Sequence, residues 1–273
     1  MSTLYQSEKV VIAAYHCGGA HSGRSREEWA EHDEIVLPRA GTFVRYDASG
    51  RAVADANQVL FFQRGQPYEI SHPVSGGDRS TIFEVTPGFF AMGLGTEAVS
   101  EPTPFGMGHM PVRTHQRLLH YQLLQKLAGE AEAFEIEEKV WTLLGDVICT
   151  SHDHPHQRKL SRSRTRKEYA ELSDQVKVYL GAHFQEKVVL EEIARAVHCS
   201  PYHLCRVFKQ MNGMTIYAYL QRLRLMGVLE HLTAYPKEAF AIVALNFGFA
   251  NHSHFSTVFR KEFGVRPSEM RRP

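Results

Sequence analysis

Two helical segments near the C-terminal end carry side chains at a spacing that suits hydrogen bonding to DNA bases. In the first, apolar residues recur at i, i+3, i+4 and i+7, which predicts one buried helix face: Leu204, Val207, Phe208 and Met211. The opposite face then presents Tyr202, Cys205, Arg206 and Lys209. Because arginine can donate two hydrogen bonds to guanine O6 and N7 in the major groove, we expect this face to read DNA sequence.

The second segment repeats the first further along the chain. VFK with a glycine at 207–213 reappears 51 residues later as VFR with a glycine at 258–264. An earlier pair of matching dipeptides, at 193–194 and 243–244, lies only 50 residues apart, which predicts one extra residue in the second turn. The expected buried residues are Phe255, Val258 and Phe259. The free face then carries His252, Ser253, Ser256, Thr257 and Arg260.

The ends of these helices carry recognisable signals, so each copy is predicted to be a helix-turn-helix. Ser200 followed by Pro201 is typical of an N-cap with proline at the first helical position, and Gly248 marks the second turn. Between the copies, Thr215 to Leu232 reads as one helix with Thr215 as its N-cap. A helix of about 18 residues spans about 27 Å, which is compatible with two helices in major-groove faces about 34 Å apart.

Charge is distributed unevenly along the 273 residues, although the whole chain carries only +1. Residues 158–273 hold 19 Lys and Arg against 10 Asp and Glu, a balance of +9. Residues 1–157 hold 12 against 20, a balance of −8. We therefore expect only the second half to meet a polyanion. Chance placement of solvated charge is the alternative.

Cysteines and hydropathy restrict the class of protein further. Four cysteines stand apart without CxxC spacing, so neither a disulfide framework nor a zinc knuckle is expected. No signal-peptide pattern begins the chain, and no apolar run approaches the roughly 20 residues of a membrane helix. These features predict a soluble protein of the reducing cytoplasm, with no membrane partner.

Residues 10–86 read as short strands separated by Gly, Pro and Asp, which favours a small antiparallel barrel or sandwich. The expected strands are 10–15, 34–37, 42–46, 59–62, 68–70 and 81–85. Residues 87–111 are rich in Gly and Pro and are expected to be irregular. The fold class is thus α+β with several domains, an N-terminal β-barrel accompanied by helices and a C-terminal all-α domain.

Two amphipathic helices are expected between the strands and the basic half. The first starts near Thr114 and ends near Gly129, and the second carries an apolar stripe from Ile136 to Val147. The stripe can serve dimerisation or can pack on the chain's own strands. Residues 151–168 have almost nothing apolar and are expected to be a linker. Three histidines there suggest a metal site, but a solvated linker is the preferred interpretation.

The segment from about 174 to 272 resembles the DNA-binding domain of the AraC/XylS family of bacterial transcription regulators. The resemblance rests on LEEIARAVHCSPYHL at 190–204, RVFK at 206–209, GF at 248–249, HFS at 254–256 and VFRKEFGV at 258–265 with PSE at 267–269. Two positions depart from the family pattern. Arg266 stands where Thr or Ser is usual, and His198 where Gly is commoner.

The resemblance implies promoter binding by two helix-turn-helix units joined by a long helix, with RNA polymerase as a further partner. Base contacts are then expected from Tyr202, Cys205 and Arg206 in the first unit and from His252, Ser253, Ser256 and Thr257 in the second. Phosphate contacts are expected from Lys209, Arg260 and Lys261. The predicted domain boundaries are 1–111 for effector sensing, 112–150 for a dimerisation or connector region, 151–168 for the linker and 169–273 for DNA binding.

The N-terminal part is only loosely similar to a cupin-type sensor. Metal-binding cupins carry a His-X-His pair, and residues 1–110 contain none, so neither a metal nor a cofactor is expected. A scattered alternative set is His16, Cys17, His21 and His32. Candidate effector contacts are polar and aromatic residues on strands: Arg45, Tyr46, Phe62, Tyr68 and His72.

The leading hypothesis is a ligand-responsive, sequence-specific transcription regulator without enzymatic activity. The family resemblance favours an activator, because activation is commoner in that family, and a homodimer is one expected arrangement. Two rival hypotheses remain. A cupin-type enzyme with a DNA-binding tail would need a metal or an acid–base pair in the barrel. A non-specific DNA-packaging protein would fit poorly with the acidic first half.

Overall fold

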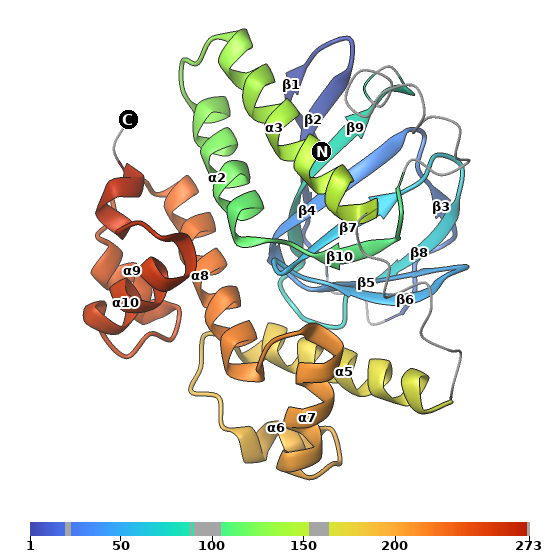
Figure 1. The fold of residues 1–273 in the computed structure, drawn as a ribbon, viewed down its shortest axis with the longest axis vertical. Helices are drawn as coiled ribbons and strands as arrows, with labels where there is room; N and C mark the ends of the chain where they lie inside the picture. Colours follow the sequence, from blue (N-terminus) through green and yellow to red (C-terminus); the bar gives the residue numbers. More distant parts are fainter. Residues whose placement is uncertain (20–22, 88, 90–104, 153–163, 272–273) are drawn as a thin grey trace. The chain divides into compact units, whose positions relative to one another are not determined.

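The computed structural model describes residues 1–19, 23–87, 89, 105–152 and 164–271 (Figure 1). The chain divides into two compact units, Met1–Leu160 and Ser161–Pro273. The first holds all the strands and two long helices, and the second is helical. No helix in these ranges is long and apolar enough to cross a membrane.

The strands of the N-terminal unit form two antiparallel sheets rather than one closed ring of paired strands among the described residues. The larger sheet has the order β1-β2-β9-β4-β7-β10 and the smaller one β3-β8-β5-β6. Their bounds are β1 Ser2–Gln6, β2 Val10–Cys17, β3 Glu28–Trp29, β4 Asp33–Gly41, β5 Phe43–Asp47, β6 Gly50–Ala54, β7 Gln58–Phe62, β8 Pro67–Ser71, β9 Asp78–Val85 and β10 His109–Pro111.

Alternation of side chains along the strands gives the larger sheet two different apolar faces. One face contributes Ile12, Ile35 and Phe61 to a core that also contains helical residues. The other contributes Val36, Leu60 and Phe62 to a second, smaller core with residues of the smaller sheet. The larger sheet therefore lies between helices on one side and the smaller sheet on the other, and a pocket can form between the sheets.

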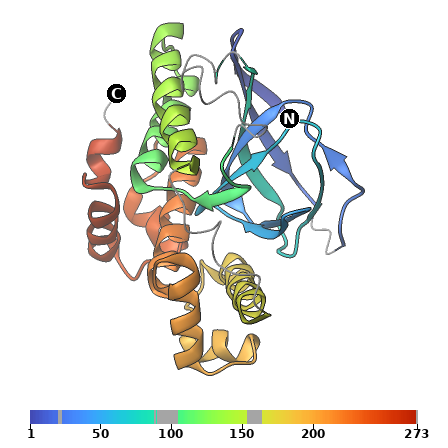
Figure 2. The same ribbon diagram turned by 45° about the vertical axis from the view of Figure 1, so that its right-hand side comes forward.

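The two helices of this unit are α2 Thr114–Ala128 and α3 Ala133–His152. Figures 1 and 2 show them side by side against the larger sheet. The α3 stripe from Ile136 to Val147 is buried in the same core as the sheet, and burying each such side chain stabilises the fold by about 1.5–3 kcal/mol. Of the two expected uses of the stripe, packing on the chain's own strands is therefore the one observed, and a role of 112–150 in dimerisation stays a prediction.

All six expected strands are present, but four further strands were missed. They are β1, β3, β6 and β10. The expectation of irregular structure throughout 87–111 was wrong at its end, since β10 pairs there with β7, His109 opposite Leu60. A three-residue strand is too short to show alternation, and Pro111 is tolerated because β10 lies at the sheet edge. Most of this stretch, 90–104, lies outside the described residues.

The expected linker is also shorter than the sequence suggested. Helix α3 continues to His152 and α5 begins at Arg164, so both ends of 151–168 are helical. Arginine, lysine and glutamate extend a helix at little cost once packed residues have nucleated it, which explains the error. Residues 153–163, with two of the linker histidines, lie outside the described residues.

The C-terminal unit consists of helices with a core rich in aromatic residues. Its elements are α5 Arg164–His183, α6 Leu190–Ala196, α7 Pro201–Asn212, α8 Ile216–Ala234, α9 Phe240–Asn246, α10 His252–Phe263 and the 3-10 helix η2 Pro267–Arg271. Phe208 of α7 meets Tyr219 of α8 edge to face, with ring centres 5.4 Å apart. Phe255 and Phe259 of α10 form a buried pair of tilted rings with centres 5.5 Å apart, and Arg222 of α8 pairs with Glu262 of α10 at 2.9 Å. The Phe208–Tyr219 contact thus holds α7 on the long helix α8, and the Arg222–Glu262 pair holds α10 there.

Candidate functional site

The first helix-turn-helix comprises α6 and α7. The Ser200 side chain accepts a hydrogen bond from the His203 backbone N–H at 3.3 Å, with Pro201 at the start of the helix, so the predicted cap is confirmed. In the turn, His198 adopts a φ of 53°, and it is the one non-glycine residue with positive φ in the described ranges. Left-handed backbone at a residue with a Cβ costs about 1–2 kcal/mol.

The second helix-turn-helix comprises α9 and α10. Its turn residue is Gly248, with a φ of 79°, and Asn251 caps α10 by accepting from the His254 N–H at 2.8 Å. The starts of α6 and α9 are 50 residues apart and those of α7 and α10 are 51. The predicted extra residue is confirmed, and it lies between the turn residue and the cap.

The outward face of α7 carries the four side chains that the apolar spacing predicted. Tyr202 is 81% exposed, which is unusual for a large aromatic ring, and Cys205, Arg206 and Lys209 are exposed as well. The inner face buries Leu204, Val207 and Phe208, whereas Met211 is only half-buried near the helix end. The exposed set follows i, i+3, i+4 and i+7, so it forms one stripe along the helix.

Arg206 is held in place by residues outside its own stripe. One terminal nitrogen, Nη2, donates to the Tyr169 hydroxyl at 3.1 Å and lies 3.4 Å from His203 Nδ1. The guanidinium carbon is 5.9 Å from the centre of the Tyr169 ring. Tyr169 lies on α5, far away in the sequence, and periodicity in α7 gave no signal for it. The pairing orients the guanidinium before any ligand arrives.

The outward face of α10 is less basic and richer in small polar groups. His252, Ser253, Thr257, Arg260 and Lys261 are exposed, and Ser256 is half-buried. The Ser256 hydroxyl lies 3.4 Å from His252 Nε2. Phe255, Phe259 and Phe263 are buried on the inner face, but Val258 is only half-buried. The two helices therefore offer different hydrogen-bonding groups on their outward faces.

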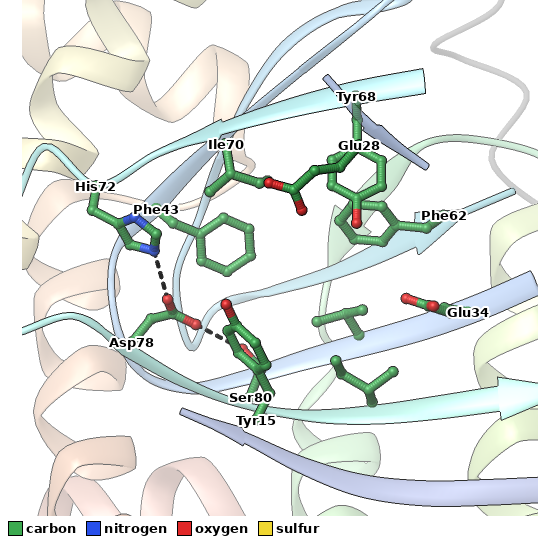
Figure 3. Close-up of a pocket in the computed structure, with 12 residues that line it drawn as sticks. Tyr15, Glu28, Glu34, Phe43, Phe62, Tyr68, Ile70, His72, Asp78 and Ser80 are labelled. Carbon is green, nitrogen blue, oxygen red and sulfur yellow. Dashed lines mark hydrogen bonds and ion pairs between the residues drawn. The ribbon is translucent and has the colours of Figure 1, made fainter. Parts of the chain in front are cut away.

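A pocket of about 120 Å³ lies between the two sheets of the N-terminal unit. Figure 3 shows His72 and Asp78 at one end, Glu34 at the other, and aromatic rings between them. The lining residues come from seven strands and the residue after β8: Tyr15, Glu28, Glu34, Val36, Phe43, Phe62, Tyr68, Ile70, His72, Asp78, Ser80 and Ile82. Trp29, next to Glu28 on β3, is 63% exposed.

Three of the five predicted effector residues line this pocket, namely Phe62, Tyr68 and His72. The other two do not. Arg45 is buried beside it, where Nη1 donates to the Phe61 carbonyl at 2.7 Å and Nε pairs with Asp47 at 3.0 Å. Tyr46 lies on the opposite face of β5 from Phe43, and its hydroxyl lies 3.2 Å from the Ser71 hydroxyl. The spacing of residues on β5 could not tell which face points inward.

His72 and Asp78 form a buried pair at one end of the pocket. His72 Nε2 is 2.8 Å from Asp78 Oδ1, and the Ser80 hydroxyl donates to Asp78 Oδ2 at 3.3 Å. Burial raises the pKa of the Asp78 carboxyl, against the lowering effect of His72 and Ser80. The pair thus satisfies much of its own hydrogen-bonding need.

Cys17 completes a possible metal-binding set with this pair. The donor atoms of Cys17, His72 and Asp78 all lie within 4.8 Å of one another. A thiolate, an imidazole and a carboxylate are ligand types that zinc accepts. The search for a His-X-His motif could not find this group, because its members come from β2, the end of β8 and β9. Of the scattered alternative set, only Cys17 belongs to it, and His21 lies outside the described residues.

The rest of the pocket carries carboxyl and phenol groups whose pKa values are raised. Burial, and secondly Glu84 opposite on β9, raises the pKa of Glu34 to about 7. Burial also raises the pKa of Tyr15 and of Tyr68 to about 12, and for Tyr68 the neighbouring Glu28 and Glu34 add to the effect. Both phenols therefore stay protonated at neutral pH and can donate hydrogen bonds.

Comparison with known proteins shows what the C-terminal unit is similar to. A family model described as a helix-turn-helix domain matches residues 193–273. The bifunctional transcriptional activator/DNA repair enzyme AdaA of Bacillus subtilis is 35% identical over 102 residues, 37% of this chain and 48% of AdaA. The HTH-type transcriptional activator RhaS of Escherichia fergusonii is 42% identical over 93 residues, 34% of this chain and 33% of RhaS.

The C-terminal unit is an AraC-type helix-turn-helix domain. The chain spans about half or less of the length of these curated relatives, and the matched segment is the AraC-type domain. Among solved structures, unsaturated fatty acid-bound ToxT of Vibrio cholerae aligns over 98% of this chain and 96% of its own, with 11% identity and a TM-score of 0.43.

Within the AraC-type domain, Arg224 of α8 supports the second turn from behind. Its Nε donates to the Phe184 carbonyl at 2.7 Å and its Nη2 to the Glu186 carbonyl at 2.6 Å. A methyl group added at Gly248 would lie 2.8 Å from this guanidinium. The side chain is buried, and this burial lowers the pKa of Arg224. Gly248 is thus required by its backbone angle and by its neighbour.

Proposed function

We propose that the protein is a transcription regulator whose AraC-type domain binds promoter DNA sequence-specifically and whose N-terminal unit binds a small-molecule effector. The observation that carries this proposal is the pair of capped, outward-facing helices α7 and α10 on an AraC-type domain. The pocket between the sheets supports the effector part, since a concave site with aromatic walls and a few polar groups is typical of ligand binding.

The side chains on each helix divide into two roles in this proposal. Those that can hydrogen-bond to base edges are Tyr202, Cys205, Arg206, His252, Ser253, Ser256 and Thr257. Those that end in a flexible cation at the helix flank are Lys209, Arg260 and Lys261, and they would meet phosphate. Phosphate contacts set the register and make binding depend on salt, whereas base contacts give specificity.

Regulation requires that the effector binds two arrangements of the protein with different affinity, since equal affinity shifts no equilibrium. The proposal places the protein in the bacterial cytoplasm, with promoter DNA and RNA polymerase as partners and a homodimer as one arrangement. It assigns no catalytic step to the N-terminal unit.

Selection of bound genomic fragments tests the proposal directly. Full-length protein is mixed with sheared DNA of the source bacterium at moderate salt, once with and once without competitor DNA. The bound fragments are then sequenced. Enrichment of a common sequence motif is expected. Uniform recovery of all fragments would instead support a non-specific packaging protein, and recovery of none would contradict DNA binding altogether.

A further inference from the structure

The pocket between the two sheets has a one-sided charge. Three carboxyl groups line it, those of Glu28, Glu34 and Asp78, whereas the described lining residues include no lysine or arginine. Beside the pocket, the Arg45 guanidinium carbon lies 4.9 Å from the centre of the Phe62 ring, and this group is paired with Asp47 and donates to the Phe61 carbonyl. We propose that the effector is a small organic cation, an ammonium compound of about six non-hydrogen atoms whose charge meets Glu28 and Glu34. This inference rests on the proposed function of the N-terminal unit.

The two glutamates are the groups left for such a ligand to pair with. Asp78 already accepts hydrogen bonds from His72 and Ser80. Glu34 faces Glu84 across the strand pair instead of a cation, and this like-charge neighbour and burial both disfavour its ionised form. Glu28 is exposed on β3 at the pocket mouth. A bound cation would relieve the repulsion, because an opposite charge favours the ionised carboxyl.

Aromatic rings form the walls between the acidic groups. Phe43, Phe62 and Tyr68 line one side, with the Phe62 and Tyr68 rings edge to face at 4.7 Å, and Tyr15 lies across from them (Figure 3). The faces of such rings attract ammonium groups and also accept an alkyl chain. The lining therefore suits a molecule with a charged head and an apolar body, and an anion would meet no lysine or arginine among the described lining residues.

The volume limits the size of this molecule. The pocket measures about 120 Å³, and an apolar cavity of roughly 150 Å³ holds benzene, so about six non-hydrogen atoms fit. A hydrated metal ion at Cys17, His72 and Asp78 would use only one end of the pocket. It would leave the glutamates and the aromatic walls without a role, which favours the organic cation.

Titration calorimetry of the full chain with three five-carbon ligands tests the charge. The probes are n-pentylammonium, 1-pentanol and pentanoate. The ammonium compound is expected to bind at least tenfold more tightly than the alcohol, and pentanoate more weakly than the alcohol. Equal binding of all three, tighter binding of pentanoate, or no binding of any at millimolar concentration would overturn the proposal.

Charge-removing variants locate the interaction. Glu34→Gln and Glu28→Gln are each expected to weaken n-pentylammonium binding about tenfold while leaving 1-pentanol binding unchanged, which a general loss of structure would not do. Glu69→Gln is the matched control, because Glu69 lies on β8 next to Tyr68 but on the other face, paired with Arg24 at 3.0 Å. An equal effect of all three substitutions would contradict the assigned site.

Two further readouts separate this inference from its alternatives. Binding of Zn²⁺ that is lost in Cys17→Ser and that displaces n-pentylammonium would reassign the pocket to a metal. Fragment selection with the Glu34→Gln variant should still enrich the same DNA motif as the unaltered chain. If the unaltered chain shows no ammonium preference but does enrich a DNA motif, only the ligand class is refuted, whereas absent DNA specificity of the unaltered chain refutes the proposed function.

Discussion

Replacing Gly248 by alanine is expected to destabilise the AraC-type domain more than the same change at Gly264. Both glycines have left-handed backbone, with φ of 79° and 75°. Alanine in this conformation costs about 1 kcal/mol net at either position. At Gly264 the added methyl group meets nothing within 4 Å, whereas at Gly248 it lies 2.8 Å from the Arg224 guanidinium.

The difference between the two variants can be estimated from the bonds of Arg224. Its side chain must move to admit the methyl group, and this movement breaks or weakens the hydrogen bonds to Phe184 and Glu186. A hydrogen bond from a charged donor contributes about 1.5–3 kcal/mol. Losing one of the two therefore gives a total of about 3 kcal/mol for Gly248→Ala, against about 1 kcal/mol for Gly264→Ala.

Urea unfolding of the full chain measures both variants. Both tryptophans, Trp29 and Trp141, lie in the N-terminal unit, so their fluorescence follows that unit alone, while far-ultraviolet circular dichroism also follows the helices of the AraC-type domain. The dichroism transition should shift to lower urea in Gly248→Ala, with the fluorescence transition unchanged. Equal free energies of unfolding for the two variants would refute the reasoning, because Arg224 would then move without cost.

Three further predictions concern DNA binding and pH. Arg206→Ala should weaken binding to the selected motif by about 1–3 kcal/mol and relax base preference at one position. The control is Lys237→Ala, which removes an exposed cation in the turn before α9 and should have neither effect. Equal loss of affinity for random and selected duplexes would show that Arg206 meets only phosphate. Tyr169→Phe removes the hydroxyl that accepts from Arg206. It should raise the dissociation constant for the motif a few-fold, since one hydrogen bond contributes about 0.5–1.5 kcal/mol, and leave binding to random DNA unchanged. An equal rise in the dissociation constants for the motif and for random DNA would contradict the orienting role of Tyr169. Burial, and secondly Arg39, lowers the pKa of His120 to about 3 from its ordinary 6.5, so the unfolded chain takes up a proton that the folded chain lacks. As the pH drops below 6.5, this residue should lower the stability of the N-terminal unit by about 1.4 kcal/mol per pH unit. His120→Gln should remove that pH dependence in urea titrations followed by Trp141 fluorescence. An unchanged pH dependence would show that His120 is not buried as a neutral group.

The two helix-turn-helix units and the helix between them were predictable because their signals are local. The caps at Ser200 and Thr215 depend on residues three positions away, and each was confirmed. The apolar spacing in α7 likewise fixes which side chains point outward. Even the one-residue difference between the turns followed from the two repeat lengths, 50 and 51.

The pocket was predictable only in part because strands bring distant residues together. Alternation shows that Phe43 and Arg45 share a face of β5, but it does not show how far each side chain lies from the cavity. Glu34 looked like an ordinary polar residue at a strand start, and only the pairing of β4 with β9 places it opposite Glu84. Likewise, Cys17 meets Asp78 through the register of β2 with β9, which residue spacing along one strand cannot reveal.

The fluorescence of Trp29 offers a readout of ligand binding to the N-terminal unit. This indole is 63% exposed and adjoins Glu28 at the entrance between the sheets, while the other indole, Trp141, is stacked on Phe89 at 4.1 Å in a different part of the unit. Because Trp29 is exposed next to Glu28 and Trp141 is stacked on Phe89, a compound that binds beside Glu28 is expected to alter the emission of Trp29 and to leave that of Trp141 unchanged. Compound libraries can therefore be screened on the unlabelled chain, with Trp29→Phe as the background, before any promoter has been identified.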